Sequence, residues 1–280
     1  MKKTLLIIAA ISSFVSCVKD TEQAEQKEIA FTAAESFSAD VITKATAVTS
    51  ISKFYVTATT TSTTGSETKL WDNKEFTKAS NDTKFTSSGI YWPASQKAMH
   101  FYASNLSPAF SGGDVTVSAN TDTDVICAYL DSPSWKSVNQ LTFDHILARL
   151  GRCTITAPEG YTGSNLSITI KPMTGGTYNL RTASWSSQTE ASSAVVVTNS
   201  FDGGGTVNDI YLIPGQYTLT AKYTLTKGTY SQSFTKTASV TVSAGCINLI
   251  SATLPQGNAT DIQFTVSVNE WTNHSITATF

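Results

Sequence analysis

YTLTAKYTL, residues 217–225, is the stretch that decides the fold class of this chain. Its apolar residues stand at every second position from Tyr217 to Leu225, and threonines and one lysine stand between them. Successive side chains of a strand point to opposite faces of the sheet. The period of two therefore predicts an antiparallel strand with one face in the core and one in solvent.

The same alternation recurs along the chain, at residues 28–33, 54–58, 99–103, 125–129, 166–170, 240–242, 247–250, 262–268 and 276–280. Turn signals separate these segments, and we expect the glycine pairs 112–113 and 175–176, the run 203–205 and the Pro214-Gly215 pair to lie in turns. No segment shows a long helical period. Short strands at this spacing predict an all-β protein built from sandwiches.

Residues 1–17, MKKTLLIIAAISSFVSC, have the pattern of a lipoprotein signal peptide. Lys2 and Lys3 precede an apolar run that is too short to cross a bilayer, and the run leads to Cys17 as the lipidation site. An ordinary cleaved signal peptide that happens to contain a cysteine is the alternative. We expect a covalent lipid with more than one acyl chain, palmitate among them, on Cys17 and no other cofactor.

Composition indicates a folded chain, because 40% of the residues are hydrophobic and 14% are charged. The net charge of −2 and the lack of a basic run argue against a nucleic-acid partner. Residues 18–27 are polar and predict a flexible tether. The Asp-Ser-Pro-Ser break at 131–134 predicts two domains, residues 28–136 and residues 137–280.

The cysteines beyond Cys17 are Cys127, Cys153 and Cys246. Three cysteines allow at most one disulfide, and their spacing leaves the pairing open. All three lie among apolar residues, which favours buried free thiols. No cluster of Cys or His has the spacing of a metal site, so no metal ligand is expected.

The stretch from Trp71 to Pro108 is dense in aromatic residues, including Tyr91-Trp92-Pro93. One interpretation is a platform of exposed rings that stack on a sugar. Burial in a sandwich core is the favoured interpretation, because large aromatic side chains usually serve packing.

Asp144 and His145 invite comparison with a catalytic pair. Neighbours along a strand point to opposite faces, and the chain has no G-x-S-x-G turn. We therefore expect no catalytic residue, and we expect His145 to make a structural hydrogen bond.

Several stretches, taken together and in order, resemble the fimbrillin-like family of Bacteroidales, whose members are subunits of surface pili. They are Glu28–Phe31, Thr43–Ala45, Ile51–Ala58, Tyr91–Pro93, Met99–Ala103, Leu141–Leu150 and Val268–Trp271. The resemblance implies a lipoprotein precursor with two transthyretin-like β-sandwich domains in tandem. It also implies a place on the outer membrane and in a fimbrium, with other fimbrillin-like subunits and a glycan or protein surface ligand as partners.

In that family a protease removes the first strand, and an extended segment of another subunit replaces it. The resemblance makes Ile29 and Phe31 the inward side chains of the removable strand and Lys44 the candidate cleavage site, although family members often carry Arg there. The alternative is that residues 28–33 remain as a permanent strand. Ile276, Ala278 and Phe280 then belong either to a donated strand or to the final core strand.

Nine residues follow Trp271, which is short for a donated extension and favours a tip, anchor or accessory role over a main stalk subunit. The expected function is therefore structural and adhesive. A monomeric glycan-binding surface lipoprotein is the alternative.

Overall fold

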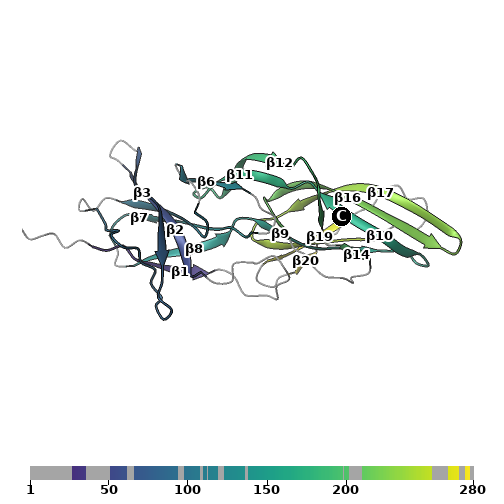
Figure 1. Cartoon of the computed structure of the whole chain (residues 1–280), viewed down its shortest axis with the longest axis horizontal. Coiled ribbons are helices and arrows are strands. Elements are labelled where there is room, and N and C mark those ends of the chain that lie inside the picture. The colour runs from purple at the N-terminus through teal and green to yellow at the C-terminus, as the bar shows by residue number, and fades with distance from the viewer. Residues whose placement is uncertain are drawn as a thin grey trace, which may run out of the picture.

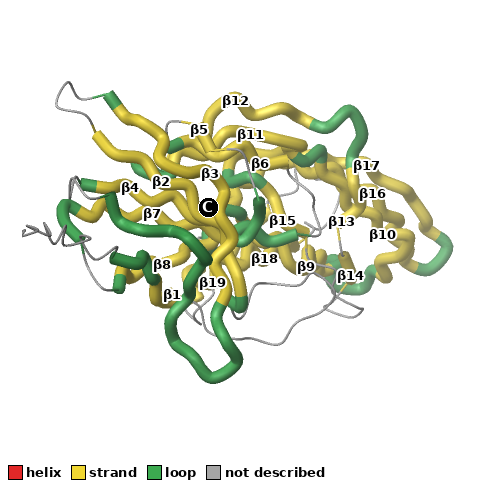
Figure 2. The backbone as a smooth tube through the Cα atoms, turned by 60° about the vertical axis from the view of Figure 1, so that its left-hand side comes forward, coloured by secondary structure: helices red, strands yellow, loops and turns green. Residues whose placement is uncertain are grey.

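The computed structural model of the chain describes residues 27–35, 51–61, 66–93, 98–107, 110–111, 113–118, 123–135, 138–197, 199–201, 210–253, 264–270 and 275–277. These residues form β-strands joined by turns and loops (Figure 2), which confirms the predicted all-β class. Across the described ranges, the search for a helix long and apolar enough to span a membrane finds none.

Six strands form the N-terminal sheet, which lies on the left in Figure 1. In spatial order they are β1 (Phe31–Glu35), β8 (Asn139–His145), β7 (Ile126–Ser132), β4 (Met99–Ser104), β2 (Lys53–Thr61) and β3 (Glu67–Thr77). β1 runs parallel to β8, whereas the other neighbours are antiparallel. The first strand of the chain is therefore paired with a strand more than a hundred residues away.

Backbone bonds outside the strands close this sheet into a ring. Thr77 at the end of β3 exchanges two hydrogen bonds with Thr86, of 2.9 and 3.1 Å. Phe85 beside it exchanges two with Phe31 of β1, of 2.7 and 3.0 Å. Residues 85–91 thus join the far edge of the sheet to the first strand, and β1 completes the ring around one apolar core.

The core of the ring consists of one face of every strand together with side chains of the closing segment. Its buried members are Ile29, Phe31, Ile51, Phe54, Val56, Ala58, Phe76, Phe85, Ile90, Trp92, Met99, Phe101, Ala103, Ile126, Ala128, Leu141 and Phe143. The alternation predicted for residues 54–58 and 99–103 is confirmed. The even-numbered residues of the first run and the odd-numbered residues of the second run face this core.

Two further sheets face each other in a C-terminal sandwich, on the right in Figure 1. One sheet has the order β13 (Val195–Val197), β10 (Thr162–Ile170), β16 (Gly215–Lys227) and β17 (Tyr230–Val242). The other has the order β14 (Asn199–Phe201), β9 (Ala148–Thr156), β18 (Cys246–Thr253), β19 (Phe264–Glu270) and β20 (Ser275–Thr277), with β15 (Ile210–Leu212) also on β9.

β16 shows how the sequence builds this sandwich. From Tyr217 to Leu225 every odd-numbered side chain is buried, and every even-numbered one is exposed or partly exposed. The buried side contacts apolar residues of β9 and β18 across the sandwich. The period of two therefore predicted both the strand and the face that it buries.

A fourth sheet links the two halves and lies between them at the top of Figure 1. Its order is β12 (Ser184–Glu190), β11 (Met173–Asn179), β6 (Asp114–Ser118) and β5 (Phe110–Ser111). β6 precedes the expected domain boundary and β11 follows it, yet they form one antiparallel pair. β8 also lies beyond residue 136 and belongs to the N-terminal sheet. The boundary and the tandem transthyretin-like pair stay predictions.

The expectation that Gly175 and Gly176 form a loop is wrong. Both lie inside β11, at a point where the pairing register shifts. A Cβ on Gly176 would lie 3.2 Å from side-chain atoms of Trp185 and Ile213, so any larger residue there would require these side chains to shift by a few tenths of an ångström. Gly113, by contrast, has a φ of 89° in the turn between β5 and β6, as expected. Gly203–Gly205 lie outside the described residues.

Candidate functional site

The first strand lies in a slot with hydrogen-bonding partners along both edges. On one edge β1 pairs with β8, from Phe31 opposite Asn139 to Glu35 opposite Phe143. On the other edge the chain just before β1 pairs with the closing segment. The remaining contacts of that edge are one hydrogen bond from Ile29 to the Ile90 carbonyl, 3.1 Å, and one from Trp92 to the Lys27 carbonyl, 2.8 Å.

Phe31 is the centre of the aromatic core below this slot. Its ring makes edge-on contacts with Phe76 and Phe101, with centroids 4.9 and 5.0 Å apart, and a longer one with Phe54 at 6.2 Å. Both Phe31 and Ile29 have no exposed surface. The two residues expected to point inward from the first strand therefore do so.

Loss of the first strand would leave a groove of defined chemistry. Its walls would be the backbone N–H and C=O groups of β8 and of residues 85–92, and its floor would be aromatic. Unpaired strand edges of this kind pair readily with another extended chain.

The other expected site residues are a lipidation site, a cleavage site and a C-terminal strand. Cys17 and Lys44, as well as Ala278 and Phe280, are outside the described residues. The backbone of Ile276 lies in β20, where it is paired with Val268 of β19. The roles expected for these five residues stay predictions.

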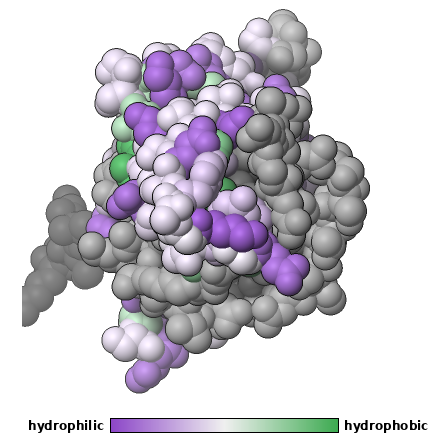
Figure 3. All heavy atoms as spheres, turned by 90° about the vertical axis from the view of Figure 1, so that its right-hand side faces the viewer, coloured by the Kyte–Doolittle hydropathy of each residue, from purple (hydrophilic) through white to green (hydrophobic). Residues whose placement is uncertain are grey.

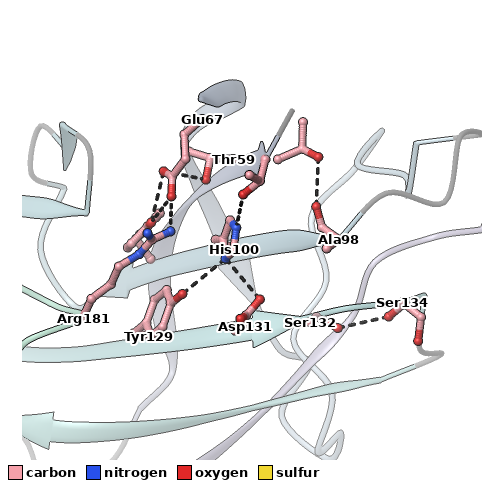
Figure 4. Close-up of polar contacts among 12 residues, drawn as sticks. Thr59, Glu67, Ala98, His100, Tyr129, Asp131, Ser132, Ser134 and Arg181 are labelled. Atoms are coloured by element: carbon pink, nitrogen blue, oxygen red, sulfur yellow. Dashed lines mark hydrogen bonds and ion pairs between the residues drawn. The ribbon is translucent and has the colours of Figure 1, made fainter. Parts of the chain in front are cut away.

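A polar network covers the opposite face of the N-terminal sheet and was not predicted from sequence (Figure 4). Arg181, in the turn between β11 and β12, forms an ion pair with Glu67 at the start of β3. Its guanidinium lies 5.5 Å from the ring centre of Tyr102 and 5.3 Å from that of Tyr129. Burial raises the pKa of Tyr102 to about 12, so this hydroxyl stays protonated and donates to Glu67 at 3.2 Å.

His100, on the interior strand β4, extends the same network. Its Nδ1 lies 3.1 Å from the Asp131 carboxylate and 3.2 Å from the Tyr129 hydroxyl, and its Nε2 lies 2.6 Å from the Thr61 hydroxyl (Figure 4). All of these residues belong to β2, β4 and β7. The network therefore fixes strands of one sheet to each other, while Arg181 ties that sheet to the linking sheet.

The residues that invited a catalytic interpretation are separated. His145 is buried and its Nδ1 lies 2.8 Å from a carboxylate oxygen of buried Asp124, whereas neighbouring Asp144 is exposed on the opposite face of β8. This places His145 in the expected structural role, with a partner that the sequence did not indicate. In the described part of the chain no group of three potential ligands could hold a metal ion.

The aromatic stretch belongs mainly to the core, as favoured above. Trp92 is 5% exposed and packs against Phe101 at 6.1 Å between ring centres. Tyr91 is 43% exposed and faces solvent. Of the two neighbouring aromatic side chains, only Tyr91 is exposed enough to stack on a sugar. Glycan binding stays a prediction.

A shallow cleft of about 310 Å³ lies on the C-terminal sandwich, between β10, β16 and the end of β12. Its polar lining includes Lys171, Glu190 and Gln216. At the far end of this sandwich the described surface is mostly polar as well (Figure 3). The cleft is also lined by apolar residues, among them Ile170, Met173 and Tyr217.

Cys127, Cys153 and Cys246 are free thiols in the structure. The first two are buried, as expected, and Cys246 is partly exposed. Burial raises the pKa of both Cys127 and Cys153 to about 12. These thiols are therefore core residues and take no part in the candidate site.

A closed ring of strands joined to a β-sandwich, with the first strand as the last member of the ring, defines the fold of this all-β protein. The chain belongs to the fimbrillin-like family, whose model matches residues 41–271. This family is fimbrial and structural, which places its members in a cell-surface appendage alongside other fimbrial subunits.

Several solved structures are similar to this chain. A putative cell adhesion protein of Bacteroides ovatus is 13% identical with a TM-score of 0.53, and the match covers 89% of this chain and 99% of that one. A putative cell adhesion protein of Bacteroides uniformis is 17% identical over 79% and 92% of the two chains, with a TM-score of 0.48. A fimbrial assembly protein of Parabacteroides distasonis is 10% identical over 90% and 99%, with a TM-score of 0.46. No curated protein matches this chain.

Proposed function

We propose that this chain is a lipid-anchored subunit of a surface fimbrium that assembles by exchange of its first strand. The observation that carries the proposal is the place of β1, which completes the ring and pairs on both edges. A strand in that place can be replaced by another extended chain without a change in the rest of the ring.

The free energy of such an exchange nearly balances. Full burial of an isoleucine or phenylalanine side chain stabilises by roughly 1.5–3 kcal/mol, so the loss of Ile29 and Phe31 exposes a groove that favours refilling. An incoming strand restores the backbone hydrogen bonds and buries its own alternate side chains. The exchange therefore needs a trigger that removes β1, and proteolysis is the simplest one.

Cleavage after Lys44 is the proposed trigger. It would separate the lipid on Cys17 and the first strand from the rest of the subunit, which would then begin at Ala45. In this proposal the first 44 residues deliver the subunit to the outer membrane and keep the groove closed until assembly.

The replacing strand comes from another fimbrillin-like subunit, and Ile276, Ala278 and Phe280 are the candidates in this chain for its own donated strand. We assign the subunit to the tip, anchor or accessory positions. Its adhesive ligand would be a glycan or protein on a host or bacterial surface.

Mass spectrometry of the mature N-terminus, on protein taken from the native cell surface, tests this proposal. An N-terminus at Ala45 in sheared fimbriae supports cleavage and exchange. An acylated Cys17 in every molecule would refute exchange and leave a permanently anchored lipoprotein. Replacement of Lys44 by alanine provides the matched control, because it should leave the lipidated precursor intact.

A further inference from the structure

The groove under the first strand has one site that demands a particular side chain. Phe31 fills the space between the rings of Phe54, Phe76 and Phe101, and its two closest contacts are both edge-on. Edge-on aromatic pairs are favourable beyond the area that they bury. A smaller side chain at this position leaves a void that packed surroundings fill only partly.

A buried amide marks a second site one peptide away. The backbone N–H of Asn139 donates to the Ala30 carbonyl at 2.9 Å, and its side-chain Nδ2 donates to the same oxygen at 3.4 Å. The Ser132 hydroxyl donates to Oδ1 of Asn139 at 3.2 Å and so holds the amide in place. Asn139 and Ser132 have no exposed surface.

These two sites act together on register. A carbonyl must face Asn139, because a buried amide without an acceptor is unfavourable by the full desolvation of its N–H groups. The residue after that carbonyl then points into the aromatic site. A strand shifted by two residues still presents a carbonyl to Asn139 but places a different side chain among the rings.

We propose that the groove selects its incoming strand by an aromatic residue in the Phe31 site, directly after the backbone carbonyl that Asn139 binds. The occupant is an extended segment of another subunit with a bulky aliphatic residue and an aromatic residue two positions later, as in Ile29 and Phe31. The inference rests on the proposed strand exchange and names the partner that the groove accepts.

The test uses the full chain with a specific protease site introduced within residues 36–50 and a fluorescent label ahead of the first strand. After cleavage, unlabelled peptides compete with the labelled strand, and the peptide concentration at half-displacement is measured. The reference peptide is Lys27–Glu35, KEIAFTAAE. The matched control carries Glu28→Gln, because Glu28 is exposed and should not affect binding.

The decisive peptide carries Phe31→Ala, and we expect it to need on the order of a hundredfold higher concentration, from the usual effect of Phe→Ala in a core. A companion of unchanged composition, Phe31→Ala with Ala33→Phe, can place its phenylalanine among the rings only when the strand shifts by two residues, which puts an alanine where Ile29 lies. We expect it to need a concentration between those of the reference and the single variant. Equal displacement by the Phe31→Ala peptide would overturn the aromatic selection while leaving strand exchange intact. Failure of every peptide, the reference included, would refute strand exchange and this inference together.

Asn139→Ala in the protein tests the second half. Because Asn139 binds a backbone carbonyl, loss of its side-chain donor should raise the half-displacement concentrations of the reference and of the Glu28→Gln control alike. Ser132→Ala is the milder companion, because it removes one hydrogen bond to Asn139 and keeps the amide. Unchanged concentrations in both folded variants would show that the Asn139 side chain does not bind the incoming strand.

Discussion

At the scale of the residue, burial decides which groups are chemically available. Ile29 and Phe31 are two positions apart in the alternating run 28–33, and both side chains are buried in the core, as expected for residues on one face of a strand. The alternation in the sequence could not place His145 next to Asp124, because twenty-one positions separate them and only the pairing of β7 with β8 brings their neighbourhoods together. It also left Cys127, Cys153 and Cys246 without a decision on pairing.

The thiols provide the first prediction at this scale. In the native protein at pH 8, Cys127 and Cys153 should not react with an aromatic disulfide reagent, because their pKa values of about 12 keep them protonated and the core keeps the reagent away. Cys246 should react faster, because it is partly exposed. The absorbance of the aromatic thiolate that the reagent releases, followed over time at increasing urea concentrations, measures the reaction of each thiol.

In protein whose Cys17 is lipidated, Cys246→Ser provides the control, since it should abolish the native reaction and leave two thiols that appear on unfolding. With pKa values of about 12, their thiolate fraction in the folded state stays very small even at pH 9, so both thiols should remain slow to react from pH 7 to 9. Fast native labelling of either buried thiol would contradict the assignment of both to the core.

At the scale of the element, the neighbours of β1 on both edges come from distant parts of the chain. Its apolar pattern predicted a strand, but nothing in residues 28–35 indicates β8 on one edge or residues 85–91 on the other. The pairing depends on closure of the whole N-terminal ring. The resemblance to the family therefore predicted which residues form the first strand. It could not predict that β8 and residues 85–91 are its neighbours.

A disulfide between β1 and β8 should lock the first strand. Thr32 and Gln140 are partners in the parallel register and lie away from the core, so paired cysteines at these positions have suitable geometry. We expect Thr32→Cys with Gln140→Cys to abolish incorporation into fimbriae under oxidising conditions. Reduction should restore it. Fimbriae are sheared and quantified by immunoblot.

Each single cysteine variant is the control and should assemble normally. Normal incorporation of the oxidised double variant, with the disulfide verified by mass spectrometry, would show that β1 remains in place in the fimbrium.

At the scale of the whole molecule, the linking sheet makes the two halves mechanically dependent. β6 pairs with β11 across the expected boundary, and Arg181 reaches from this sheet to Glu67. The Asp-Ser-Pro-Ser break at 131–134 is a real turn region after β7, but hydrogen bonding continues past it. Composition shows where a chain turns, and it does not show which strands meet afterwards.

The ion pair to Glu67 should contribute modestly to this coupling. Arg181→Ala should lower the free energy of unfolding by about 1 kcal/mol, because the pair is partly exposed and the guanidinium also packs between Tyr102 and Tyr129. Urea unfolding followed by tryptophan fluorescence measures it.

Glu67→Gln and the double variant complete a thermodynamic cycle that separates the ion pair from the packing on the two rings. Strictly additive effects would show that Arg181 acts through the tyrosine rings alone. Lys171→Ala, in the more exposed pair with Glu190, is the matched control and should change stability by a smaller amount.

The sequence by itself determined the β class, the faces of the strands and the core membership of most aromatic residues, because these follow from side-chain alternation within a few residues. Only the tertiary structure decided the ring, the linking sheet, the partners of His145 and Arg181, and the placement of Gly176. Each of these depends on contacts between strands far apart in the chain, and the free energy of such contacts belongs to the packed whole. The groove of the first strand depends on both the sequence and the tertiary structure. Its apolar side chains can be recognised in the sequence, whereas its walls form only when the ring of strands closes.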